Sequence, residues 1–118
     1  MKKILVAEDN DSNYILMTYI LKKYYQYERA KNGEEAVKMV EEGQYDIVLM
    51  DIKMPVMDGL EATRKIKETH PDLPIVALTA NAFDSDRQLA FDAGCNDFLS
   101  KPVSSDACLK TIKKFTGE

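Results

Sequence analysis

The sequence has no tryptophan, one histidine and only two cysteines, and these scarcities exclude several kinds of site. Cys95 and Cys108 do not stand in a Cys-x-x-Cys or other metal spacing, and His70 precedes Pro71 in a predicted loop. We therefore expect neither a zinc site nor a thiol nucleophile. With no secretory signal, both cysteines are expected to be reduced packing residues. Packing roles are also expected of Met54, Met57, Phe83 and Phe91.

Long apolar runs and basic patches are missing as well. The longest hydrophobic run is far too short to span a bilayer, and the first three residues lead directly into a predicted strand and not into a signal peptide. The 16 lysines and arginines are outnumbered by 20 aspartates and glutamates, which gives a net charge of -4 and argues against a nucleic-acid surface. We expect a cytoplasmic protein with no membrane segment and no nucleic-acid partner.

The chain does contain a regular alternation of short apolar runs and helix-like segments. The runs cover residues 3–7, 47–50, 75–78 and 98–99, with a weaker one at 27–30. Predicted helices follow them, beginning at Ser12, at Asn32-Gly33, at Asp58-Gly59, near Asp84, and at Ser104 or Ser105. This pattern predicts one α/β domain over residues 1–118, built from five strand-helix units. It favours a flavodoxin-like, doubly wound parallel sheet in the order 2-1-3-4-5.

Polar residues stand where these strands end. Glu8 and Asp9 follow the first strand, Asp51 ends the third, Thr79 ends the fourth and Lys101 follows the fifth. Ligands of such sheets bind beyond the carboxyl ends of the strands, at the switch point between strands one and three. Three crowded acids repel one another unless a cation is bound, and Mg²⁺ prefers oxygen ligands. The sequence therefore predicts a magnesium site at Glu8, Asp9 and Asp51.

Each of these residues, taken alone, also has a purely structural interpretation. An acid after a strand is often a helix N-cap, which is the role that we expect of Asp58. Thr79 alone is typical of a turn, and Lys101 alone of a solvated surface charge. The mutual repulsion of the clustered acids has no structural benefit, and for that reason the cluster is interpreted as functional.

Several short motifs occur in order at the strand ends, and together they resemble the receiver domain of two-component response regulators over essentially the whole chain. The motifs are Glu8-Asp9, Asp51 with Met54-Pro55 and Asp58-Gly59, Thr79-Ala80, and Lys101-Pro102. Residues 8–13, 78–82 and 99–103 are most similar to receivers attached to hybrid sensor histidine kinases.

This resemblance implies a phosphorylation-controlled switch. Asp51 would accept a phosphoryl group from a phosphohistidine of a sensor histidine kinase or a histidine phosphotransfer protein, in a Mg²⁺-dependent reaction. The family pattern implies that Asp9 and Asp51 bind Mg²⁺ directly, that Glu8 binds it mainly through water, and that the backbone carbonyl of Lys53 contributes too. Thr79 and Lys101 would hold phosphoryl oxygens. The family also catalyses its own dephosphorylation, with no external turnover substrate.

Three further positions follow from the same resemblance. Lys53 and Asn81 would border the path of the hydrolytic water. Phe98 stands three positions before Lys101, where many relatives carry Tyr. We expect an inward Phe98 ring to be favoured even without phosphate, because a phenyl ring gains only from apolar burial.

Competing interpretations are weaker. A haloacid-dehalogenase-like phosphatase also uses a strand-end Asp and Mg²⁺, but it requires a second Asp where this chain has Lys53. A pseudo-receiver that only docks partners would not need Asp9, Asp51, Thr79 and Lys101 together. A flavin or nucleotide binder is disfavoured because no glycine-rich turn follows the first strand. Since no output domain follows Glu118, we expect a single-domain regulator, a phosphorelay intermediate or a segment of a larger kinase.

Overall fold

The computed structural model describes residues 1–80 and 84–117, and within them strands and helices alternate along the chain. The elements are β1 (Lys3–Ala7), α1 (Asp11–Leu21), β2 (Gln26–Ala30), α2 (Gly33–Glu42), β3 (Ile47–Asp51), α3 (Gly59–Thr69), β4 (Ile75–Thr79), α4 (Asp84–Ala93), β5 (Asp97–Ser100) and α5 (Ser105–Thr116). The strands form one parallel sheet in the order β2-β1-β3-β4-β5. The predicted doubly wound, flavodoxin-like fold is confirmed.

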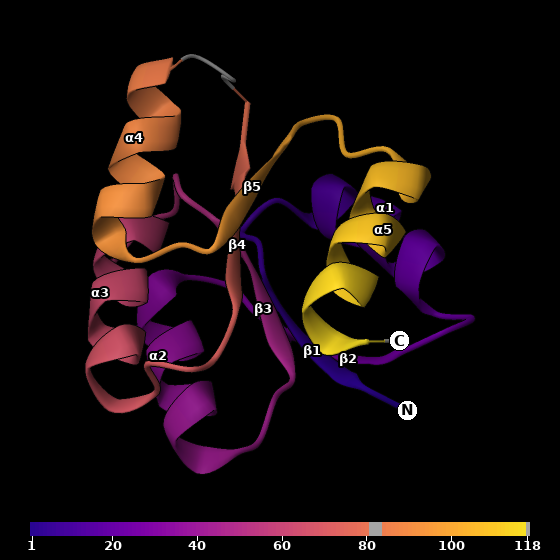
Figure 1. The fold of residues 1–118 in the computed structure, drawn as a ribbon, viewed down its shortest axis with the longest axis horizontal. Coiled ribbons are helices and arrows are strands. Elements are labelled where there is room, and N and C mark those ends of the chain that lie inside the picture. Colours follow the sequence, from indigo (N-terminus) through magenta and orange to yellow (C-terminus); the bar gives the residue numbers. More distant parts are fainter. Residues whose placement is uncertain (81–83, 118) are drawn as a thin grey trace.

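Helices cover both faces of the sheet (Figure 1). Helices α2, α3 and α4 lie on one face, and α1 and α5 lie on the other. Every residue of β3 and β4 is buried, as expected for central parallel strands that are covered on both sides. Strand β2 lies at the edge, and its first and third residues are exposed. This position explains why β2 had the weakest apolar pattern of the five predicted strands.

The helix starts agree with the sequence prediction except in α1. Side chains of the residues before three helices accept the expected capping hydrogen bonds, namely Asn32, Asp58 and Ser104. The prediction that Ser12 caps the first helix is wrong. Asn10 has the extended backbone of an N-cap, and its Oδ1 accepts a hydrogen bond from the Asn13 N–H at 3.0 Å. Helix α1 therefore begins at Asp11, and Ser12 lies inside its first turn.

Helix α1 is less deeply packed than its apolar sequence suggested. Met17, Ile20 and Leu21 are buried against the sheet. Ile15, Leu16 and Tyr19 are 52%, 45% and 64% exposed, so a second apolar side of this helix faces solvent.

The expectation of packing roles holds for most of the residues concerned. Cys95 and Cys108 are buried free thiols, and Met54 and Met57 are partly buried against the core. Phe91 packs only in part, because 42% of its surface is exposed, although its ring forms an edge-to-face pair with the Phe98 ring. Two residues singled out from the sequence, Asn81 and Phe83, lie outside the described residues.

Among the helices in the described part of the chain, none is long and apolar enough to cross a membrane.

Candidate functional site

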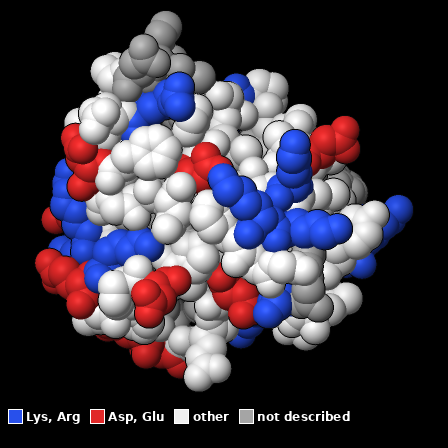
Figure 2. Space-filling view, viewed as in Figure 1, with Lys and Arg blue, Asp and Glu red and all other residues white. Residues whose placement is uncertain are grey.

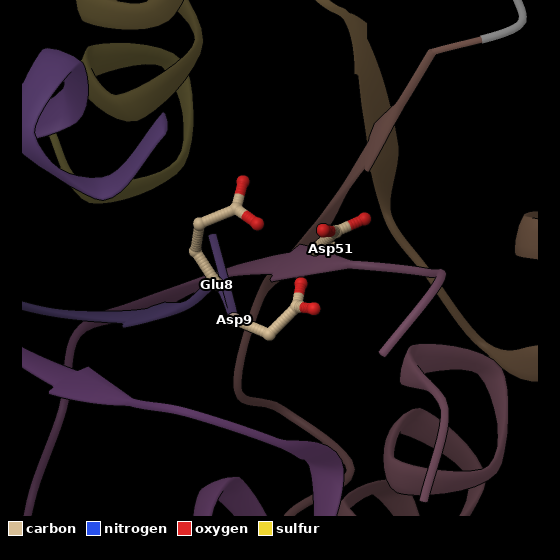
Figure 3. A group of neighbouring side chains, drawn as sticks. All are labelled: Glu8, Asp9 and Asp51. Carbon is tan, nitrogen blue, oxygen red and sulfur yellow. The ribbon is translucent and has the colours of Figure 1, made fainter. Parts of the chain in front are cut away.

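Three carboxylates meet at the carboxyl edge of the sheet. Glu8 and Asp9 follow β1, and Asp51 is the last residue of the neighbouring strand β3. One carboxylate oxygen of each lies within 4.8 Å of the others, and Figure 3 shows the three side chains turned toward one another. Glu8 and Asp51 are buried, whereas Asp9 is exposed to solvent. The predicted convergence of these acids is confirmed.

Lys101 contacts the two buried acids. Its Nζ lies 2.9 Å from Glu8 Oε1 and 2.9 Å from Asp51 Oδ2. The other oxygen of Asp51, Oδ1, accepts a hydrogen bond from the backbone N–H of Lys53 at 3.2 Å. The ammonium group of Lys101 therefore bridges the acid that follows β1 and the acid that ends β3.

Thr79 reaches the same edge from β4. The register pairs Asp51 with Leu78, so Thr79 lies one residue beyond Asp51 along the sheet edge. Its side chain is buried, and its carbonyl accepts a hydrogen bond from the Lys101 N–H at 2.7 Å. The structure thus brings together Thr79, Lys101 and the three acids, as the sequence predicted.

The start of α3 packs closely against the backbone of Asp51. Asp58 caps this helix, with Oδ1 accepting a hydrogen bond from the Glu61 N–H at 2.8 Å, so its predicted structural role is confirmed. The next residue is Gly59, and a Cβ atom there would lie 2.1 Å from the carbonyl oxygen of Asp51. Only glycine lets the helix begin this close to the strand end that carries Asp51.

Burial and crowding perturb the ionisation of the site. Desolvation, followed by the hydrogen bond with Asp51, raises the pKa of Glu8 to about 7, although the contact with Lys101 acts in the opposite direction. Burial lowers the pKa of Lys101, but its contacts with Glu8 and Asp51 outweigh this effect and raise that pKa above its ordinary value. The single lysine therefore leaves negative charge at the site that a further cation would neutralise.

The donor set fits a hard cation. Carboxylate oxygens are the only side-chain donors of the cluster, with no nitrogen or sulfur ligand in the group. Glu8 Oε1 is buried, and Lys101 Nζ lies 2.9 Å from it. Three carboxylates that one lysine only partly neutralises, one of them exposed to solvent, fit a magnesium site.

A groove opens onto the site beside Asp9. It has a volume of about 550 Å³ and runs between the segment after β3 and helix α4. The lining includes Asp9, Lys53, Met54, Asp86 and Leu89. A larger hollow of about 830 Å³ is lined by residues that precede β3 and β4, which places it at the opposite edge of the sheet, away from the acids. Access to the cluster is therefore from the Asp9 side.

One residue that contacts the backbone of the acidic cluster was not predicted from the sequence. Arg29 of β2 donates a hydrogen bond from Nε to the carbonyl oxygen of Glu8 at 3.0 Å. The residues of β2 alternate between exposed and half-buried positions, and Arg29 stands at a half-buried one. A charged residue at such a position was the sequence feature that could have indicated this contact.

Comparison with known proteins agrees with this geometry. The response regulator receiver domain family matches residues 4–113. Hybrid signal transduction histidine kinase B of Dictyostelium discoideum is 43% identical over 129 residues, which cover 97% of this chain but only 7% of that kinase. The chain thus spans a small part of the length of such a relative.

Solved structures show the same likeness. The receiver domain of a sensor histidine kinase from Pseudomonas aeruginosa PAO1, solved with a magnesium ion coordinated in its active-site cleft, has a TM-score of 0.93 and 36% identity, covering 99% of this chain and 98% of that one. The receiver domain of the Saccharomyces cerevisiae response regulator Ssk1, solved with the histidine phosphotransfer protein Ypd1, has a TM-score of 0.93 and 34% identity, covering 98% of this chain and 89% of that one.

The fold and the acidic cluster define a phosphorylation switch of the doubly wound α/β class. The chain belongs to the response regulator receiver domain family, and its curated relatives include receivers of hybrid sensor histidine kinases.

Proposed function

We propose that Asp51 is the phosphoacceptor of this receiver domain. An oxygen of its carboxylate forms the new bond to phosphorus while the phosphorus–nitrogen bond of a phosphohistidine breaks, and the imidazole leaves. The product is an acyl phosphate on Asp51. The observation that carries this proposal is the position of Lys101 Nζ, 2.9 Å from Asp51 Oδ2, in a site where Asp51 itself is buried.

Phosphoryl transfer depends mainly on positioning and on neutralising charge, and this chain has groups for both tasks. Lys101 would pair with one phosphoryl oxygen, and the Thr79 hydroxyl would hold another. In self-dephosphorylation, a water oxygen forms a bond to phosphorus, the bond from phosphorus to the Asp51 oxygen breaks, and inorganic phosphate leaves. The domain then acts on its own acyl phosphate and has no external turnover substrate.

The metal in this proposal is Mg²⁺. Glu8, Asp9 and Asp51 would hold it, Glu8 mainly through water, together with the backbone carbonyl of Lys53. When bound, Mg²⁺ neutralises charge on the phosphoryl oxygens. The oxygen-only donor set supports this assignment, as does the magnesium ion in the cleft of the similar Pseudomonas receiver.

The proposed phosphodonor is a phosphohistidine on a sensor histidine kinase or on a histidine phosphotransfer protein, acting in the cytoplasm on a receiver unit that occupies residues 1–118. The similar yeast receiver was solved with such a phosphotransfer protein. The exposed side of α1 lies next to the site, because Leu16 lines a small pocket together with Glu8 and Lys101. Exposed apolar residues at the rim of an acceptor site favour docking of a protein donor there.

A titration with beryllofluoride, a mimic of the phosphoryl group, tests this function. In the presence of Mg²⁺, amide resonances of Asp51, Thr79 and Lys101 should shift with one-to-one stoichiometry, and Asp51→Asn should abolish the shifts. A pseudo-receiver that docks partners without phosphorylation would show no such response in the parent protein. Equal responses of the parent and Asp51→Asn would place the anion elsewhere and refute the assignment.

A further inference from the structure

We propose that Arg29, on the edge strand β2, is a positioning residue that holds the segment carrying Glu8 and Asp9 in its cation-binding geometry. This inference rests on the proposed function, because it concerns the affinity of the same acidic site for Mg²⁺. Arg29 touches neither the metal nor the phosphoryl group in this account, and it acts through the backbone of Glu8 and through Asp11.

The Arg29 guanidinium contacts the segment on both sides of Asp9. Its Nε donates to the Glu8 carbonyl oxygen at 3.0 Å, and its Nη1 lies 2.9 Å from Asp11 Oδ1. The Glu8 carbonyl belongs to the peptide group that joins Glu8 to Asp9. Fixing the plane of that peptide group restricts the direction in which the Asp9 side chain leaves the backbone.

The backbone strengthens this attachment. The Glu8 N–H donates to the carbonyl oxygen of Ala30 at 3.0 Å, so the N–H and the carbonyl of one residue are both bonded to the end of β2. Glu8 Oε2 in turn accepts a hydrogen bond from the Asn10 N–H at 3.3 Å. The turn from Glu8 to Asp11 is therefore held at several points, and Arg29 contacts it at the Glu8 carbonyl and at Asp11, whereas Lys101 contacts only the Glu8 side chain.

Arg29 itself is held firmly. Its side chain is only 17% exposed, and its guanidinium carbon lies 4.6 Å from the centre of the Tyr14 ring. Within the described residues, the buried Nη2 atom has no hydrogen-bond partner. The planar guanidinium can stack on an aromatic ring and donate from two nitrogens at once, which the single ammonium group of a lysine cannot do.

Packing alone does not account for this arrangement. A buried ion pair can often be replaced by apolar side chains of similar size without loss of stability, so charge pairing alone does not require Arg29 at this position. Its partner Asp11 is 83% exposed, so removal of Arg29 leaves no buried charge behind. The contact that distinguishes Arg29 from an apolar replacement is the one with the Glu8 peptide, next to the acids.

The test measures Mg²⁺ affinity by calorimetry well below the melting temperature, so that all variants are folded. Arg29→Met and Arg29→Lys should each weaken Mg²⁺ binding by about tenfold, the effect expected when the support of a metal ligand is removed. The phosphorylation rate with acetyl phosphate should approach that of the parent at saturating Mg²⁺, because only the affinity is changed. Arg64→Met is the matched control, since Arg64 is an exposed arginine on α3, and it should bind Mg²⁺ like the parent.

Asp11→Asn keeps the test decisive if Arg29→Met does not fold. Asp11 is exposed, and its substitution removes one of the two attachments of Arg29, so Mg²⁺ binding should weaken by about threefold. Arg29→Lys and Asp11→Asn variants that bind Mg²⁺ as tightly as the parent would overturn the role of Arg29 and leave the proposed function standing. Failure of the parent protein to bind Mg²⁺ would overturn the proposed function itself.

Discussion

The ammonium group of Lys101 lies 2.9 Å from Asp51 Oδ2, and this contact joins the loop after β5 to the end of β3. The same nitrogen lies 2.9 Å from Glu8 Oε1, so one lysine partly neutralises two buried carboxylates. Figure 2 shows basic and acidic side chains on the same visible face, with a group of adjacent basic side chains near its centre.

Replacing Lys101 with methionine should destabilise the metal-free protein. The change leaves Glu8 and Asp51 buried without a cation, and removal of one partner of a buried ion pair costs about 3 kcal/mol. Chemical denaturation should show this loss, and added Mg²⁺ should restore part of it. Lys114→Met is the control, because Lys114 forms an exposed pair with Asp97 at 3.5 Å and should matter little. Equal stability of the Lys101 variant and the parent would show that the ion pair is unimportant.

The stability of the metal-free protein should depend on pH through Glu8. The folded state raises the pKa of Glu8 from 4.5 to about 7, so between these values the folded protein binds a proton that the unfolded chain has released. The free energy of unfolding should therefore fall as the pH rises from about 5 to about 8. Glu8→Gln should flatten this dependence in thermal melts, and an unchanged slope in that variant would assign the effect to another group.

Val56 should be a site of stabilising substitution. It is 76% exposed and has a φ angle of 67°, which is strained for a β-branched residue. Asn adopts this backbone region more readily, so Val56→Asn should stabilise the protein by about 1 kcal/mol, or raise Tm by about 4 °C. Val56→Gly should gain less, because glycine also increases the entropy of the unfolded chain. A lower Tm for Val56→Asn would contradict the assignment of strain.

Phe98 should favour its inward position before phosphorylation. In the structure its ring is half-buried against the core, edge-on to Phe91 at 6.4 Å, with the Arg87 guanidinium 4.7 Å from its centre. Full exposure of a phenylalanine forfeits about 1.5–3 kcal/mol of burial. Ring resonances of Phe98 and amide shifts of α4 should change only modestly on adding beryllofluoride. A ring that is rigidly outward in the free protein and turns inward on activation would contradict this prediction.

The location of the acidic cluster followed from the sequence because of a property of parallel sheets. Once the strands before Glu8 and Asp51 are recognised, the order 2-1-3-4-5 places their carboxyl ends side by side, whatever the details of packing. Lys101 and Thr79 follow for the same reason. Site residues fixed by strand order alone are the ones that sequence reasoning finds.

Features that depend on local torsion angles or on tertiary contacts were not predictable. Asn10 and Ser12 are both good N-cap residues, and only the backbone conformation decides that Asn10 has this role. The apolar residues of α1 did not reveal that Ile15 faces solvent, because a broadly apolar helix has no clear polar side. The contact of Arg29 with Glu8 joins residues that are 21 positions apart in the chain and has no local sequence signal.

Intact-mass analysis after incubation with acetyl phosphate and Mg²⁺ tests the central claim, that Asp51 is the phosphoacceptor, most directly. The parent protein should gain one phosphoryl group that is stable to acid and labile to base and hydroxylamine, as an acyl phosphate is. Asp51→Asn should gain none. Stoichiometric labelling of the Asp51→Asn variant at a neighbouring acid such as Asp9, or no labelling of the parent, would contradict the account.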